Sequence, residues 1–357
     1  MTGYILQKTG YALLTLFGVV TVIFLLFTLL PGDPARMMLG QNENAEQIAV
    51  VKKKYGFDQP IYIQYLQYLN DLSPLSFHSK NPDNYTFLSE NKYTYTKLFI
   101  VANTDVVVKF PYLRESFQKN GKKVSAVIAE TLPNTFVLAV SAICIAMFLG
   151  VLLGIISVLV KDGWIDKSIQ LISTLGMSVP SFFSAIIFAW IFGFVLHKYT
   201  GLNMTGSLYE VDDFGEGKHL QLKNLILPAI VLGIRPLAVV SQLMRNSLLE
   251  VLNQDYIRTA KAKGLSFYTI ITRHALKNSL NPVVTAISGW FASMLAGAVF
   301  VEYIFGWNGL GKEIVDALNT LDLPIIMGAV LVIATMFILI NIFVDIIYGW
   351  LDPKIRN

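Results

Sequence analysis

The stretch PNTFVLAVSAICIAMFLGVLLGIISVLV, residues 133–160, decides the fold class of this 357-residue chain. It contains no charged residue, and it exceeds the roughly 20 apolar residues that a helix needs to cross a bilayer. The whole chain agrees with this reading, because 54% of its residues are hydrophobic, 15% are charged and the mean hydropathy is +0.55. Soluble domains carry about 25% charged residues, so the composition excludes a soluble enzyme, a disordered chain and a fibrous repeat. The single cysteine, Cys144, excludes a disulfide scaffold, and the net charge of +4 does not indicate nucleic-acid binding.

Five further apolar stretches are long enough to span a membrane, which predicts an all-α polytopic membrane protein with six transmembrane helices. The first ends at Leu30-Pro31-Gly32-Asp33-Pro34, a strong helix stop, and lacks the small-residue cleavage site of a signal peptide. Pro180 lies inside the third span and predicts a bend there. Gly150 and Gly154 predict a smooth helix face for close packing. The five stretches are 11–30, 168–196, 225–248, 282–301 and 324–350.

The charges of the loops predict the orientation of these helices. Loops rich in Lys and Arg stay on the cytoplasmic side of a membrane. The basic segments are Lys161–Lys167, the loop 249–281 with Arg245 just before it, and the tail Lys354–Arg356. The alternate loops are acidic, so both termini are predicted to face the cytoplasm. The acidic residues are Glu210, Asp212, Asp213, Glu216, Glu302, Glu313, Asp316 and Asp322.

On this topology residues 1–30 form the first transmembrane helix, 31–132 an extracytoplasmic segment, and 133–357 the core transmembrane domain. Apolar residues at helical spacing over 48–70, divided by Gly56 and Pro60, predict two short helices in the outer segment. The β-branched runs 98–101 and 106–108 flank a polar turn and predict a β-hairpin.

The cytoplasmic loop 249–281 is the most informative part of the chain. Helix-forming residues from Asp255 run into Gly264, which suits a left-handed C-terminal cap. Ser266 then suits the N-cap of a second short helix, which continues to Asn278. Helix, glycine corner and second helix predict a small, basic, stiff knob, residues 255–280, that a soluble cytoplasmic partner could hold.

The segment Tyr256-Ile257-Arg258-Thr259-Ala260-Lys261-Ala262-Lys263-Gly264-Leu265, followed by Arg273-His274-Ala275-Leu276-Lys277-Asn278, resembles the EAA loop of ABC importer permeases of the dipeptide/oligopeptide/nickel family. Further stretches resemble the same family over nearly the whole chain, and most closely its B-type, or first, permease subunit. These are Leu30–Pro34, Ser178–Phe182, Val301–Phe305 with Gly309–Gly311, and Asp345–Arg356.

The chain departs from the general motif at two places. Arg258-Thr259-Ala260 stands where the motif has Glu-Ala-Ala, and the closing proline is replaced near Lys277-Asn278, as is usual in the peptide branch. Residues 73–111 resemble an insertion upstream of the second helix.

The resemblance implies a type I ABC importer permease fold, in the inner membrane of a bacterium, with a small mixed extracytoplasmic insertion. It implies a second related permease, two cytoplasmic ABC ATPases and an extracytoplasmic substrate-binding protein as partners. The chain itself is then no enzyme and holds no cofactor, since ATP and magnesium belong to the ATPases. The implied cargo is a di- or oligopeptide, and nickel or another small solute is the alternative. The implied ATPase-docking residues are Asp255, Tyr256, Arg258, Thr259, Ala260, Lys261, Ala262, Gly264, Leu265, Arg273, His274 and Leu276.

Several other features bear on binding or catalysis. Gly306–Lys312 imitates a phosphate-binding loop, but Glu313 follows where a Ser or Thr should hold magnesium, so no nucleotide site is predicted. Arg235 and Asp345 are ionisable residues within apolar spans, and Arg235 is a candidate for the substrate path. Gly289, Ser293 and Gly297 form a small-residue stripe that either packs against another helix or lines the pore.

No catalytic or metal-binding pattern is present in the sequence. The four histidines are scattered, and no paired carboxylates fall at catalytic spacing within a helix. The remaining alternatives are an intramembrane enzyme, which would need polar catalytic groups within the spans, and a secondary transporter, which would be expected to show internal repeats.

Overall fold

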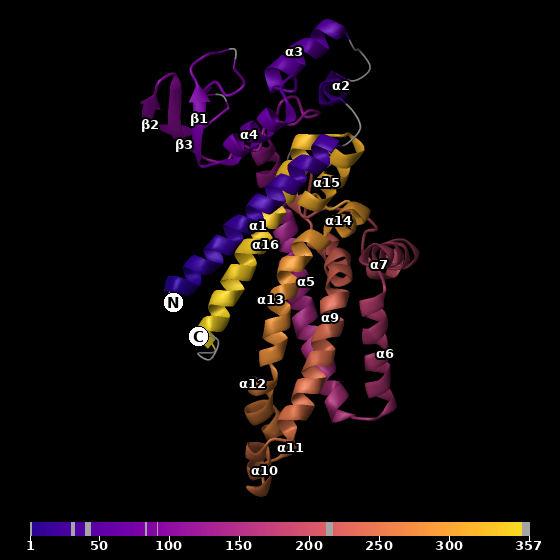
Figure 1. The fold of residues 1–357 in the computed structure, drawn as a ribbon. Coiled ribbons are helices and arrows are strands. Elements are labelled where there is room, and N and C mark those ends of the chain that lie inside the picture. The colour runs from indigo at the N-terminus through magenta and orange to yellow at the C-terminus, as the bar shows by residue number, and fades with distance from the viewer. Residues whose placement is uncertain are drawn as a thin grey trace. The chain divides into compact units, whose positions relative to one another are not determined.

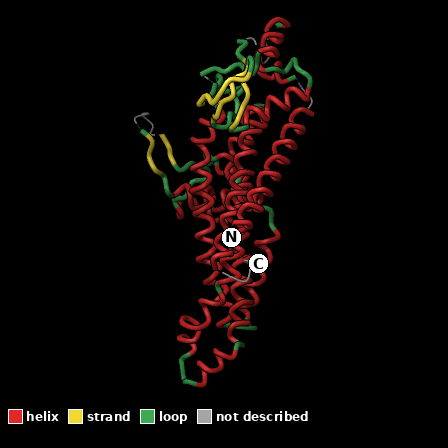
Figure 2. Tube along the Cα trace, turned by 60° about the vertical axis from the view of Figure 1, so that its left-hand side comes forward, coloured by secondary structure: helices red, strands yellow, loops and turns green. Residues whose placement is uncertain are grey.

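The computed structural model describes residues 2–29, 33–39, 44–82, 84–90, 92–211 and 217–351. The chain divides into two compact units, Met1–Glu130 with Asp316–Thr335, and Thr131–Val315 with Met336–Asn357. Helices make up most of the described chain, and strands form two small groups (Figures 1 and 2). Three predicted features lie outside the described residues: the turn at Leu30–Gly32, the acidic residues Asp212, Asp213 and Glu216, and the C-terminal segment from Asp352 with its basic tail.

Four described helices are long and apolar enough to cross a membrane, and two bent helix pairs bring the number of spans to six if each pair crosses once. These spans match the six predicted from the sequence, although the second begins at Val124 rather than at Pro133, which lies inside the helix. The four helices are α1 (Thr2–Leu29), α5 (Val124–Leu159), α9 (Lys223–Leu252) and α16 (Leu323–Leu351).

The third predicted span, 168–196, turns a sharp corner at Pro180. Helix α6 (Trp164–Ser178) meets the segment Ser181–Val195 at 109°, and that segment consists of α7 (Ser181–Phe188) and a π-helical stretch, Ala189–Val195. Val179 is extended, with φ −78° and ψ 131°, because a residue before proline is disfavoured in the helical region. The bend expected at this proline is therefore a corner between two helices.

The fifth predicted span is also divided. Helices α13 (Asn281–Gly297) and α14 (Val299–Phe305) meet at 57°. Glu302, which the sequence places in the loop after this span, lies inside α14 and is 0% exposed.

The first unit confirms the predicted pair of short helices. Helix α3 (Ala45–Tyr55) ends at Gly56, which has a left-handed φ of 73°, and α4 (Ile61–Leu72) begins after Pro60. Helix α2 (Pro34–Leu39) precedes them. The apolar core of this unit gathers residues from α1, α4 and α16, namely Val20, Ile23, Phe24, Tyr68 and Leu331.

The predicted hairpin is confirmed and belongs to a three-stranded antiparallel sheet with the order β1-β3-β2. Strands β2 (Tyr95–Val101) and β3 (Thr104–Lys109) form the hairpin, and β1 (Leu75–Ser79) pairs with β3, with Leu75 opposite Val108. Strand β1 was not predicted, because Phe77 is the only one of its five residues that belongs to the β-branched and aromatic types typical of strands.

The buried carboxylate of Asp71 attaches the insertion to α4. It accepts hydrogen bonds from Tyr85 Oη at 2.8 Å and Tyr93 Oη at 3.3 Å, and it pairs with Arg114 Nε at 3.1 Å. Lys109 Nζ donates to the backbone oxygen of Asp71, and burial lowers the pKa of Lys109 to about 8. Asp71 thus joins the helical and the β parts of the first unit.

The second unit contains most of the remaining helical residues, and its core is formed by residues of α5, α7, α9, α13 and α14. An added Cβ at Gly150 would lie 2.6 Å from Val240 Cγ1, and one at Gly154 would lie 2.6 Å from Met244 Cβ. The predicted smooth face of α5 therefore packs directly on α9. The shorter elements of this unit are α8 (His197–Thr200), β4 (Tyr209–Val211), β5 (Lys218–Leu220), α10 (Asp255–Ala262), α11 (Phe267–Thr269), the π-helical segment Ile270–Ala275 and α12 (Leu276–Ser279). Helix α15 (Leu310–Asn319) begins in this unit, and its residues from Asp316 belong to the first.

Candidate functional site

The knob, residues 255–280, has the helix–corner–helix form predicted for it. Helix α10 gives way to Gly264, whose φ is +76° and whose added Cβ would meet nothing within 4 Å. The glycine is therefore required for its left-handed backbone and not for lack of space. Ser266 caps the next helix by accepting a hydrogen bond from the Thr269 N–H at 3.3 Å. The π-helical turn at Ile270–Ala275 was not predicted.

One apolar core joins the knob to its neighbouring helices. Ile257 and Ala260 of α10, with Ile270 and Ala275 of the second half, pack in one cluster with Met244 and Leu248 of α9 and Val283 of α13. Asn278 Nδ2 also donates to Tyr256 Oη at 2.8 Å, which ties the two halves together. The knob is therefore packed rigidly onto the helices that precede and follow it.

Most of the predicted docking residues lie on the outer face of the knob. Ala260 is the exception, because only 6% of it is exposed and it packs in the core, and Leu276 is half-buried. The Arg258 guanidinium forms a surface ion pair with Asp255 at 3.2 Å. The residues of the predicted set that are exposed are Asp255, Tyr256, Arg258, Thr259, Lys261, Ala262, Gly264, Leu265, Arg273 and His274.

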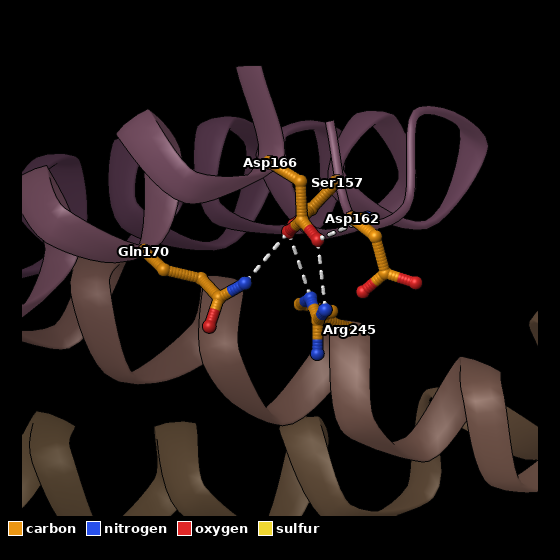
Figure 3. Close-up of polar contacts among 5 residues, drawn as sticks. All are labelled: Ser157, Asp162, Asp166, Gln170 and Arg245. Atoms are coloured by element: carbon orange, nitrogen blue, oxygen red, sulfur yellow. Dashed lines mark hydrogen bonds and ion pairs between the residues drawn. The ribbon is translucent and has the colours of Figure 1, made fainter. Parts of the chain in front are cut away.

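A buried carboxylate, Asp166 at the start of α6, contacts side chains from the end of α5 and from the C-terminal part of α9 (Figure 3). Arg245 binds it with two parallel hydrogen bonds, Nε to Oδ1 at 2.9 Å and Nη2 to Oδ2 at 2.8 Å. Gln170 Nε2 donates at 2.9 Å, the Asp162 N–H donates at 3.0 Å, and the Ser157 hydroxyl donates as well. We call this group of five residues the clamp.

The clamp was not predicted from the sequence. Asp166 lies in the lysine-containing segment 161–167, and both this segment and Arg245 served only to predict which side of the membrane the loops face. An acid inside a basic loop and an arginine inside an apolar span are each the expected signature of a buried pair. That signal was present in the sequence, but it does not say which partner each residue has.

Arg235 and the small-residue stripe stand apart from the knob. Arg235 is exposed, and its Nε and Nη2 lie 3.4 and 3.3 Å from the Met177 backbone oxygen. An added Cβ at Gly289 would meet nothing within 4 Å, and Ser293 is exposed. Gly297 lies in α13. At Gly289 and Ser293 the stripe does not pack closely against the described part of this chain.

The loop that imitates a phosphate-binding site encloses a carboxylate of the chain itself. The N–H groups of Gly311 and Lys312 donate to Glu302 Oε2 at 2.7 and 3.2 Å. An added Cβ at Gly309 would lie 2.3 Å from the same oxygen. The loop also contacts α5, because Trp307 Nε1 donates to the Asn134 oxygen at 3.0 Å and the Leu310 N–H donates to Thr135 Oγ1 at 2.8 Å.

The backbone donors that a phosphate would need are therefore already used by Glu302.

Asp345 lies in α16, where the structure describes its backbone alone. Among the described residues there is no group of three or more His, Cys, Asp or Glu side chains placed to hold a metal ion.

Comparison with known proteins assigns the chain to a family. Residues 146–357 match the family "Binding-protein-dependent transport system inner membrane component", and residues 1–79 match the N-terminal region of such components. The "Dipeptide transport system permease protein DppB" of Alkalihalophilus pseudofirmus is 32% identical over 369 residues, covering 100% of both chains. The "Di/tripeptide transport system permease protein DppB" of Pseudomonas aeruginosa is 33% identical over 371 residues, covering 100% of this chain and 99% of that one. The resemblance noted in the sequence is thus confirmed, and the chain belongs to the family of binding-protein-dependent transport system inner membrane components, as a permease of ABC importers.

Proposed function

We propose that this permease forms, with a second related permease, the path by which peptides cross the inner membrane, and that the knob transmits the closure of separate ATPases to that path. The observation that carries the proposal is the single apolar core of the knob, α9 and α13. A partner that displaces the knob would displace both helices with it, because close-packed interiors transmit force and do not absorb it. The relatives named for dipeptide and di/tripeptide transport support peptides as the cargo.

The exposed face of the knob fits a soluble protein partner of acidic character. Arg258, Lys261, Lys263 and Arg273 are all exposed, and Tyr268 beside them is 77% exposed. Exposed aromatic and arginine side chains are the residues that most often carry binding energy at protein interfaces. We infer that two cytoplasmic ABC ATPases supply ATP and magnesium, so the permease itself needs no cofactor, and that an extracytoplasmic binding protein delivers the cargo.

The proposed orientation places both termini and the knob in the cytoplasm. Labelling with a membrane-impermeant maleimide tests it, with Cys144→Ser as the background and Thr272→Cys as the single reactive site. Thr272 is exposed on the knob. Labelling is expected only after the inner membrane is opened, whereas labelling in sealed, right-side-out vesicles would place the knob outside.

The small-residue stripe has a place in this proposal. Gly289 and Ser293 are open in the single chain, which suits a face that meets the second permease or lines the path. Gly297 continues the stripe. Arg235 is the proposed contact for a peptide carboxylate, and an Arg235→Gln variant that takes up every cargo at the normal rate would remove that role.

The decisive experiment reconstitutes the whole transporter from native membranes and measures uptake of labelled di- and tripeptides together with ATP hydrolysis. In the double variant Arg258→Glu and Lys261→Glu we expect uptake to be lost and the ATPases to dissociate, while the permease still inserts. The matched control is Lys198→Glu, an exposed lysine on α8 outside the knob. Normal uptake in the double variant contradicts the docking role, and uptake of nickel without peptide contradicts the cargo.

Gly264, at the corner of the knob, gives a separate test of whether the knob transmits the movement of the ATPases to α9 and α13. Gly264→Pro is incompatible with a φ of +76°, whereas asparagine tolerates the left-handed region. We expect Gly264→Pro to abolish uptake and Gly264→Asn to retain most of it. Ala260→Glu is less informative, because Ala260 is buried and a charge there would unfold the knob.

A further inference from the structure

The clamp ties α6 to the helix that carries the knob. Asp166 lies in the first turn of α6, and Arg245 lies on α9 next to Met244, which packs in the core of the knob. The contacts of the Asp166 carboxylate come from three segments of the chain, as Figure 3 shows.

This arrangement is stiff for three physical reasons. The Arg245 guanidinium and the carboxylate form two parallel charge-assisted hydrogen bonds, which fix orientation as well as distance. Asp166 is 1% exposed, so water does not compete for these bonds. The carboxylate also lies at the N-terminal end of α6, where the helix dipole favours a negative charge.

The other end of α6 also lies against α9. An added Cβ at Gly176 would be 3.0 Å from Ile234 Cγ2, and Arg235 approaches the Met177 oxygen at 3.3 Å. Directly after this contact the chain turns 109° into α7. Any displacement of α6 is therefore passed to the corner at Val179–Pro180.

We propose that Asp166 and Arg245 are a positioning pair that makes α6 and the α7 corner move as one body with α9 and the knob. The inference rests on the proposed function, because it adds α6 to the body that the ATPases are proposed to displace through the knob. The two side chains bind each other, and the proposed role requires no contact of either with the cargo or the ATPases. Their role is to extend the displaced body beyond the two helices that are joined directly to the knob.

A distance measurement tests this directly. Spin labels at Thr174→Cys on α6 and Thr272→Cys on the knob, in the Cys144→Ser background, report the separation of the two elements in the assembled transporter. Both positions are exposed. In the otherwise unchanged chain the distance should be the same in the nucleotide-free and nucleotide-trapped states. In Arg245→Met the distance should change or broaden on trapping.

The second readout is the coupling of peptide uptake to ATP hydrolysis. Peptide uptake per ATP hydrolysed should fall by about tenfold in Arg245→Met, within the range of ordinary coupling energies, and Arg245→Lys should restore part of it. The matched control is Lys167→Met, which removes an exposed cation of the same turn and should change neither readout.

The outcomes separate the two proposals. A merely structural pair would lower uptake and ATP hydrolysis together, with the ratio and the label distance unchanged, and that result overturns the positioning role. A label distance that changes on trapping in the unsubstituted clamp overturns it as well. An unsubstituted transporter that hydrolyses ATP without moving peptide overturns the proposed function instead.

Discussion

Asp166 and Glu302 are both buried carboxylates of the second unit, with exposures of 1% and 0%, but the groups that bind them differ. Asp166 receives a guanidinium and three further donors. The Glu302 carboxylate accepts hydrogen bonds from two backbone N–H groups and also interacts with the Thr135 side chain, and within the described part of the chain its Oε1 has no hydrogen-bond partner. A buried ion pair and a carboxylate held in a backbone loop should respond differently to loss of charge.

The difference follows from what each carboxylate holds in place. The clamp joins the adjacent helices α5 and α6 to α9, whose Arg245 is 79 positions from Asp166, and it needs a strong, directional contact to do so. Glu302 instead shapes a single glycine-rich loop between α14 and α15, where backbone donors converge at the start of a helix. The clamp therefore depends on the negative charge of Asp166, which pairs with Arg245. The loop depends on a Glu302 oxygen that accepts hydrogen bonds, whether or not the side chain is charged.

Asp166→Asn is expected to have the largest effect. It leaves Arg245 buried without its anion, and removing one member of a buried pair costs about 3 kcal/mol or more. The apparent unfolding midpoint of the detergent-solubilised transporter should fall clearly. The control is Glu250→Gln, which removes the charge of an exposed carboxylate on α9 outside the clamp. Equal midpoints for the two variants would mean that the clamp adds no stability.

Gly309→Ala should come next. Its Cβ would lie 2.3 Å from Glu302 Oε2 and 2.5 Å from the carboxyl carbon, so the buried carboxylate or the loop must move. Overpacking of this kind costs about 1 to 3 kcal/mol. The same midpoint measurement checks it. Gly18→Ala in α1, where an added Cβ meets nothing within 4 Å, should leave the midpoint unchanged, and an unchanged Gly309→Ala would show that the loop is loosely packed.

Trp307→Phe should have an intermediate effect of about 2 kcal/mol, from one lost hydrogen bond and a small cavity. Trp307 is 0% exposed, and its indole donates to the Asn134 oxygen at 3.0 Å. Trp190→Phe is the control, since 56% of Trp190 is exposed. A thermal midpoint shifted equally by both variants would remove the role of Trp307 in joining the loop to α5.

The features that the sequence predicted correctly have local causes. Gly264 and Ser266 determine the knob corner through backbone conformation and capping, and Gly56 and Pro60 divide the outer helices in the same way. The spacing of Gly150 and Gly154 predicted a close helix contact, and the structure supplies the partner helix, α9.

The features that were missed depend on contacts between distant residues. Asp166 and Arg245 are 79 positions apart, so no local pattern relates them. Glu302 was placed in a loop because a carboxylate ends the apolar run, yet the loop folds back and buries it in α14. The angle between α6 and α7 at Pro180 could not be predicted from the sequence either. Proline predicts a break in the helix, but the 109° angle depends on how the two helices pack.

Glu302→Gln should have the smallest effect and distinguishes the two carboxylates most sharply. The amide oxygen can accept the same N–H groups of Gly311 and Lys312, and removing the charge relieves the cost of burying it. The new NH2 replaces an oxygen that has no partner among the described residues, and this offsets part of the gain. The net change should stay within about 1 kcal/mol, against about 3 for Asp166→Asn, in the same midpoint measurement. If Glu302→Gln destabilises as strongly as Asp166→Asn, the charge of Glu302 must itself be paired in the assembled transporter, and the contrast between a charge contact and an acceptor contact is wrong.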